Sequence, residues 1–198
     1  MANRYNRDIH HRRSIRLKGY DYFRAGGYFV TICARDRECL FGEIMNGEMR
    51  PNEFGRIVRD EWVRSAEIRA EIELGEYVVM PNHFHGMVMV KCRGTARRAP
   101  TAEQFGKPVS GSLPTVVRSF KSAVTNHINA IRQSPGAPVW QRNYYEHIIR
   151  DDADYHRIAE YIADNPRRWA EDTLHPDNVM VGVGARRAVP LRETRRPR

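Results

Sequence analysis

Two histidines separated by a single residue are the sharpest chemical feature of the sequence. They stand in Met80-Pro81-Asn82-His83-Phe84-His85-Gly86, ahead of an apolar run that ends at Val90. In a β-strand, residues two positions apart point to the same face, so His83 and His85 would present their imidazoles side by side. Such a pair binds a divalent metal ion when a third ligand joins it. Two ordinary histidines on a half-exposed strand would give the same pattern.

A second feature is the cluster Tyr144-Tyr145-Glu146-His147. A phenol with its ordinary pKa of about 10 is a poor nucleophile unless a metal ion or a base assists it. Phosphoryl transfer suits such assistance, because a cation polarises the phosphate oxygen and offsets the charge of the transition state. Adjacent aromatic residues also occur as core or base-stacking residues. The cluster is therefore compatible with a nucleophile and with plain packing.

The charge of the chain favours a polyanionic partner. The 198 residues include 33 Lys and Arg against 24 Asp and Glu, a net charge of +9. Most of the cations are arginines, whose planar guanidinium matches phosphate groups. A nucleic acid is the partner that such a balance indicates, although a basic soluble surface needs none. The candidate nucleic-acid contacts are cationic or aromatic side chains of a basic arm and of a later helix: Arg12, Arg13, Arg16, Lys18, Tyr20, Tyr22, Arg118 and Lys121.

These residues must be positioned by an α+β fold. Residues 28–33 and 40–44 are rich in strand-forming residues and predict an antiparallel pair, followed by a turn at Asn46-Gly47. Apolar residues at three-four spacing predict helices, and β-type runs predict further strands. The first expected helix begins near 52 and ends near 75, and two more begin near 115 and 152. Residues 77–80 and 83–90 are expected to form a pair of short strands or one bent strand. This order indicates an antiparallel sheet with the helices packed on one face.

The expected organisation is one catalytic domain with basic extensions. We expect a basic aromatic arm over 1–25, a catalytic domain over 26–170 with a flexible insertion at 91–114, and an irregular basic tail over 171–198. No apolar run is long enough for a transmembrane helix, and the start of the chain lacks a secretory signal. Three cysteines without CxxC spacing indicate neither a disulfide framework nor a zinc ribbon. A cytoplasmic protein is the expectation.

Several stretches together resemble one family. They are Arg13 to Tyr22, Tyr28 to Cys33, Glu38 to Gly42, Val78 to His85, and Val139 to Arg150, with Tyr161-Ile162 and Asn165-Pro166 behind them. The His pair in a Met-Pro-Asn-His frame, with Trp-Gln-Arg-Asn-Tyr downstream, resembles the HUH single-tyrosine (Y1) transposases. Within them the chain looks like the REP-associated tyrosine transposases of the IS200-like group. The resemblance covers most of residues 12–170.

The resemblance implies a ferredoxin-like core, a nucleophile on a C-terminal helix, and Mg²⁺ or Mn²⁺ as cofactor. His83 and His85 carry over as metal ligands, and Tyr144 matches the nucleophile position best, with Tyr145 as the fallback. The transposon branch places a polar metal ligand one helical turn after its tyrosine, but Ile148 stands there after Tyr144. Glu146 and His147 are neighbours able to serve as the third ligand, with His147 slightly favoured.

The activity that the resemblance implies is DNA processing. The enzyme would recognise hairpin-bearing single-stranded DNA, such as a REP palindrome, cleave it through a 5′-phosphotyrosine intermediate, and transfer the strand in DNA transposition. It would work as a monomer or a homodimer. One alternative is a structured nucleic-acid-binding module, or domesticated regulator, with little turnover. Another is a metal-dependent phosphodiesterase in which water attacks and tyrosine only stacks.

Overall fold

A four-stranded antiparallel sheet forms the centre of the computed structural model, which describes residues 25–91 and 111–180. The strand order is β4-β5-β1-β6, and every pairing is antiparallel. The strands are β1 (Gly26–Cys33), β4 (Ile72–Val79), β5 (His83–Val90) and β6 (Tyr145–Ile149), while the helices α1 (Glu53–Glu67) and α2 (Leu113–Ile131) connect them. The succession β1-α1-β4-β5-α2-β6 in this order is the ferredoxin-like arrangement. The predicted α+β class is confirmed.

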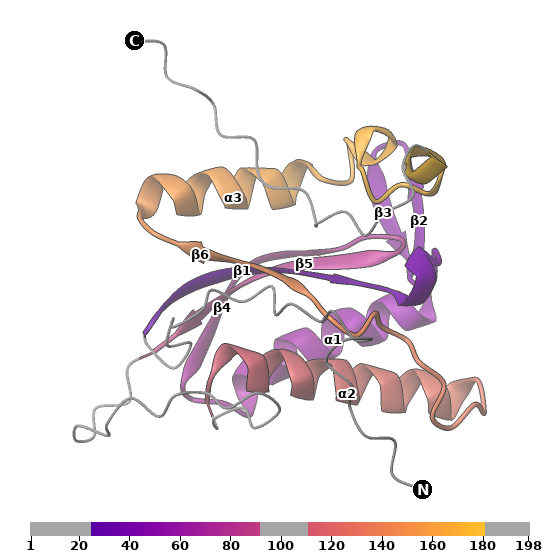
Figure 1. The fold of residues 1–198 in the computed structure, drawn as a ribbon, viewed down its shortest axis with the longest axis horizontal. Helices are drawn as coiled ribbons and strands as arrows, with labels where there is room; N and C mark the ends of the chain where they lie inside the picture. The colour runs from indigo at the N-terminus through magenta and orange to yellow at the C-terminus, as the bar shows by residue number, and fades with distance from the viewer. Residues whose placement is uncertain (1–24, 92–110, 181–198) are drawn as a thin grey trace, which may run out of the picture.

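The helices cover both faces of the sheet. α1 and α2 lie against one face, and α3 (Asp152–Asp164) lies against the other (Figure 1). The prediction that all helices pack on one face is therefore wrong in this detail. The physical reason is an apolar stripe on α3, since Ile158 and Ile162 are buried against Phe29 and Met87, which project from the far face of the sheet.

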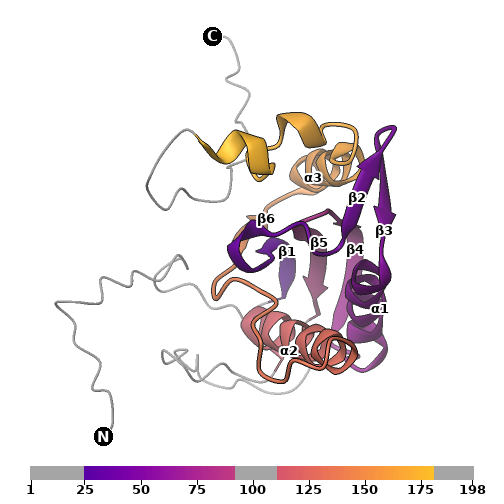
Figure 2. The same ribbon diagram turned by 90° about the vertical axis from the view of Figure 1, so that its right-hand side faces the viewer.

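The second predicted strand pairs elsewhere. β2 (Gly42–Met45) forms a separate hairpin with β3 (Glu48–Pro51), so its expected pairing with β1 is wrong. Both edges of β1 are already taken by β5 and β6. The turn signal itself holds: Asn46 and Gly47 have φ of 54° and 77°, which favours a tight two-residue hairpin. Figure 2 shows this hairpin at one end of the molecule.

Helix boundaries follow local capping. The Asn52 side chain accepts a hydrogen bond from Gly55 N at 3.0 Å and so caps α1. The helix ends at Glu67, earlier than the expected end near 75, because β4 already begins at Ile72. The Asp151 side chain caps α3 through the amide of Asp154. Two short 3-10 turns, η2 (Trp169–Glu171) and η3 (Pro176–Met180), follow α3 and occupy the start of the expected tail.

Some expectations lie outside the described residues. These are the arm contacts Arg12, Arg13, Arg16, Lys18, Tyr20 and Tyr22, and most of the 91–114 insertion. Within residues 25–91 and 111–180, no helix combines the length and the apolar character that crossing a bilayer requires.

Candidate active site

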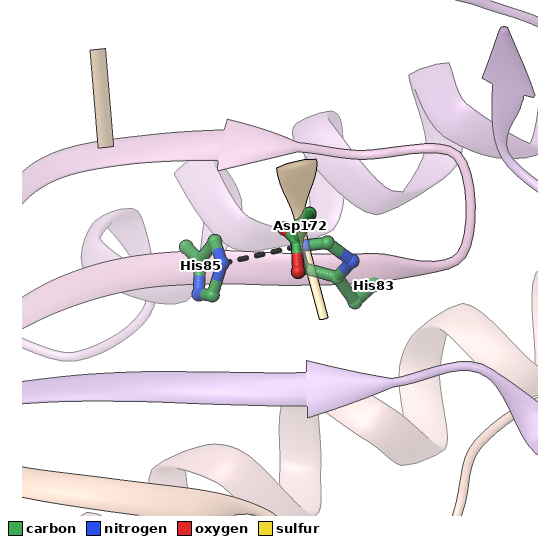
Figure 3. A group of neighbouring side chains, drawn as sticks. All are labelled: His83, His85 and Asp172. Atoms are coloured by element: carbon green, nitrogen blue, oxygen red, sulfur yellow. Dashed lines mark hydrogen bonds and ion pairs between the residues drawn. The ribbon is translucent and has the colours of Figure 1, made fainter. Parts of the chain in front are cut away.

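His83 and His85 lie side by side on β5, as the strand pattern predicts. Phe84 and Val88 point into the core beneath α1 and α2, so the alternation of β5 turns both histidines toward α3. The two rings are fully or almost fully buried, and their Nε2 atoms are 3.0 Å apart. Figure 3 shows the two imidazoles next to each other with Asp172 beside them.

Hydrogen bonds at Nδ1 orient both rings. His83 Nδ1 donates to Asn82 Oδ1 at 2.8 Å, because the Asn82 amide nitrogen is itself a donor to Leu174 O at 2.7 Å. His85 Nδ1 lies 2.9 Å from the Thr31 hydroxyl, which can accept from it. Partners of this kind at Nδ1 are typical of metal-binding histidines, because they leave the Nε2 lone pairs for the cation.

Both imidazoles are neutral at ordinary pH. Burial holds the pKa of His83 well below its usual range, with further lowering by His85 and Arg37. Burial lowers the pKa of His85 to about 3. Neutral imidazole is the form that coordinates metal ions.

Asp172 supplies an acidic oxygen to the same place. Its Oδ2 lies 3.6 Å from His83 Nε2, and the ligand atoms of His83, His85 and Asp172 all lie within 4.8 Å of one another. Leu174 N donates to Asp172 Oδ1 at 2.7 Å and fixes the carboxylate, while burial raises its pKa. Ligand atoms about 2.1 Å from one metal ion at right angles stand about 3.0 Å apart, so the donor set fits a divalent cation.

Tyr161 brings a phenol to the histidines from α3. Its hydroxyl lies 3.4 Å from His85 Nε2, and its ring meets the His85 ring edge-on at a centroid distance of 5.3 Å. Burial raises the pKa of Tyr161 to about 12, and the Asp172 carboxylate also raises it. At neutral pH this phenol is therefore almost wholly protonated, and nucleophilic use of it requires a nearby positive charge.

One helical turn after Tyr161 stands Asn165. Its side chain is 4% exposed, and its Oδ1 is buried with no hydrogen-bond partner in the part of the chain that the structure describes. A buried amide oxygen without a partner is costly unless a ligand satisfies it. The Asn165 side chain also hydrogen-bonds the Tyr161 phenol and lowers the pKa of that group, so its buried oxygen stands beside the phenol.

The predicted tyrosine cluster divides between the two faces of the sheet. Tyr144 and Ile148 pack against the core on the α1 and α2 side, and strand alternation turns Glu146 the same way. The structure therefore does not bring Tyr144 or Glu146 to the histidines. Tyr145 lies on the α3 side, with its ring 6.5 Å from that of Phe29.

His147 also lies on the α3 side, but it is engaged elsewhere. Its Nε2 is 2.8 Å from Asp154 Oδ2, near the start of α3. Burial acts to raise the pKa of Asp154, but hydrogen bonds from His147 and the Arg150 amide outweigh it and hold that pKa below its ordinary value. The pair joins β6 to α3, and the cluster with metal-binding spacing has Asp172 in place of His147.

The two cations predicted on α2 have different surroundings. Lys121 donates to Gln141 O at 2.6 Å and to Arg142 O at 3.1 Å, and burial lowers its pKa to about 8. Lys121 thus holds the segment that leads into β6. Arg118 is exposed on the helix surface and is available to a partner.

Tyr161 and Asp172 are the residues that the sequence interpretation did not select. Tyr161 had a weak signal, since a hydroxyl-bearing ring sits on the apolar stripe of the last predicted helix, next to the Asn165-Pro166 end. Asp172 had none, because it lies in an irregular segment that resembles a tail.

Comparison with known proteins gives relatives but no matching family model. A Haemophilus influenzae protein of uncharacterized function is 44% identical over 184 residues, which cover 89% of this chain and all of the relative. A second protein of that organism, provisionally assigned as a REP-associated tyrosine transposase, is 26% identical over 170 residues and covers 79% of this chain and 84% of the relative.

A solved structure shares the fold. It is a REP-associated tyrosine transposase bound to a REP hairpin, with a TM-score of 0.51 and 21% identity, and the match covers 85% of each chain. The fold likeness agrees with the sequence similarity to the second Haemophilus influenzae protein and with the resemblance found in the sequence. In sequence the chain is thus similar to a protein provisionally assigned as a REP-associated tyrosine transposase, and in fold to a solved member of that group.

Proposed function

We propose that this protein cleaves and transfers hairpin-bearing single-stranded DNA through a 5′-phosphotyrosine formed on Tyr161. The observation that carries the proposal is the Tyr161 hydroxyl, 3.4 Å from His85 Nε2, where two imidazole Nε2 atoms meet at 3.0 Å. The related structure bound to a REP hairpin supports the choice of substrate.

His83 and His85 would hold a divalent cation together with an oxygen of Asp172 or Asn165. A mixed set of imidazole and oxygen donors is compatible with Mn²⁺ or Mg²⁺. When bound, the cation would polarise the phosphate and stabilise the charge that develops on its oxygens. Asn82 and Thr31 hold the rings in the orientation that this requires.

The chemistry exchanges one phosphate ester for another. The Tyr161 oxygen attacks the phosphorus of a phosphodiester, and the bond between phosphorus and the 3′ oxygen breaks. The phenol loses its proton and the departing 3′ oxygen gains one, so that a free 3′-OH and a tyrosine ester of the 5′ phosphate result. Attack by that 3′-OH, or by another, reverses the step and transfers the strand.

The site is complete within one chain, which supports a monomer as the working unit. Tyr161, both histidines and Asp172 all come from the same chain. Substrate binding would draw on Arg118 and on the arm residues Arg12, Arg13, Arg16, Lys18, Tyr20 and Tyr22, through phosphate contacts and base stacking.

The test is a covalent-adduct assay. The protein is incubated with Mn²⁺ and a panel of end-labelled hairpin oligonucleotides with single-stranded flanks, and denaturing gels reveal protein-linked DNA. The wild type and the Tyr145→Phe variant should form the adduct, whereas Tyr161→Phe should bind DNA but form none. An adduct that persists in Tyr161→Phe would refute the assignment. Tight binding without cleavage by the wild type would favour the binding-module alternative.

A further inference from the structure

A short turn after β1 carries an arginine to the edge of the candidate site. In η1 (Arg35–Arg37), both Asp36 and Arg37 adopt positive φ, 53° and 59°. Left-handed backbone is unfavourable for residues other than glycine and persists only where the surroundings enforce it. Arg37 N donates to Ala34 O at 3.2 Å, and Ala34 N donates to Asn82 O at 2.8 Å, which fastens the turn to the residue before His83.

Asn82 joins this turn to the rest of the site. Its amide nitrogen donates to Arg37 O at 3.2 Å and to Leu174 O at 2.7 Å, while its oxygen accepts from His83 Nδ1 at 2.8 Å. Leu174 follows Asp172 by two residues, and Asn82 itself is 1% exposed. One buried side chain therefore sets the relative positions of the segments that carry Arg37, His83 and Asp172.

Arg37 lies where these segments meet, because the Asn82 side chain donates to its carbonyl at 3.2 Å and Asn82 precedes His83. The Arg37 side chain is half-buried, and no carboxylate of the described residues lies within ion-pair distance of it. Its neighbour Arg35, in contrast, is exposed and pairs with Asp36 at 3.0 Å. Arg37 is thus a half-buried cation that is held through its backbone beside the site and forms no contact ion pair with the described residues.

We infer that Arg37 is a DNA-phosphate contact of this site and binds the phosphodiester that is presented to Tyr161. The inference rests on the proposed function. Tyr161 approaches the His85 end of the imidazole pair, and Arg37 is fastened through Asn82 at the His83 end, so the phenol and the arginine approach the pair from its two ends. The planar fork of arginine binds two phosphate oxygens at once.

The test measures binding separately from cleavage. Fluorescein-labelled dT6, too short to span many distant contacts, is titrated in Mn²⁺ by fluorescence anisotropy against the Tyr161→Phe protein, which forms no adduct. In this Tyr161→Phe background, the Arg37→Ala substitution should weaken binding of dT6 about tenfold, as expected for the loss of one charge-assisted contact. It should also reduce the slope of log Kd against log salt by about 0.7. Arg37→Lys should keep the slope and lose part of the affinity.

Arg35→Ala is the matched control, and its effect should stay within about twofold, as expected for an exposed, ion-paired arginine. Arg37→Gly removes the same charge and also relieves the left-handed backbone, so it should melt no lower than the wild type and still lose affinity. Equal binding by the Arg37→Gly and Arg35→Ala proteins would overturn the inference. A different outcome separates the two proposals. If the wild type forms no adduct but the Arg37 variants still bind dT6 more weakly than Arg35→Ala, the proposed cleavage is overturned and the phosphate contact stands.

Discussion

Thr31→Val tests how the site prepares His85 for a cation. Thr31 is 4% exposed and its hydroxyl lies 2.9 Å from His85 Nδ1, while the His85 ring is 2% exposed. Valine has nearly the same shape as threonine, so packing changes little and the hydrogen bond is lost. The buried Nδ1 then lacks a partner, which costs about 1–3 kcal/mol of folding free energy. Removal of such a partner also weakens metal binding about 10–100-fold.

The assay combines Mn²⁺ titration calorimetry with thermal unfolding in EDTA. For a domain of this size each 1 kcal/mol corresponds to about 2–4 °C, so Tm should fall by about 2–12 °C. Thr125→Val is the control, because the Thr125 hydroxyl donates at 2.7 Å to the carbonyl of Lys121 within α2, away from the histidines. That variant should keep the wild-type affinity for Mn²⁺. Unchanged Mn²⁺ affinity in Thr31→Val would refute the role of Thr31 in orienting the ring.

Three further predictions concern the core and the ligands. Gly86→Ala should destabilise the fold by about 1–3 kcal/mol in urea unfolding, because the new Cβ would lie 2.7–2.8 Å from ring atoms of Phe84 and Trp62; wild-type stability would contradict this. In EDTA, stability should fall as pH drops below about 6.5, since unfolded histidines take up protons that burial denies to the folded rings. His85→Asn should show a shallower pH dependence, and an equally steep one would count against the buried neutral ring. Asp172→Asn should lower Mn²⁺ affinity about tenfold or more by calorimetry, because ligand charge sets affinity; an unchanged value would remove Asp172 from the ligand set.

The features that are local in sequence were predictable. The orientation of His83 and His85 follows from strand alternation alone, and the Asn46-Gly47 turn follows from its two residues. The order of helices and strands also indicated the α+β class, since each element carries its own periodicity.

Features that depend on tertiary contacts were not predictable in this way. Tyr161 comes to His85 across 76 positions of the chain, and only the packing of α3 on the far face of the sheet makes that contact. Asp172 reaches the histidines from an irregular segment, held by the Asn82 bond to Leu174. Tyr144 matched the nucleophile position of the resembled family best, but it packs against the core on the other face of the sheet. The identity of a nucleophile depends on such long-range contacts.

The most direct test of the account is a crystal structure of the protein soaked in Mn²⁺, with anomalous diffraction used to locate the ion. We expect one strong peak bonded to Nε2 of both His83 and His85, with an oxygen of Asp172 or Asn165 in its coordination sphere and the Tyr161 hydroxyl facing it. A peak elsewhere with none at the imidazole pair, or a Tyr161 side chain turned away from an ion bound there, would contradict it.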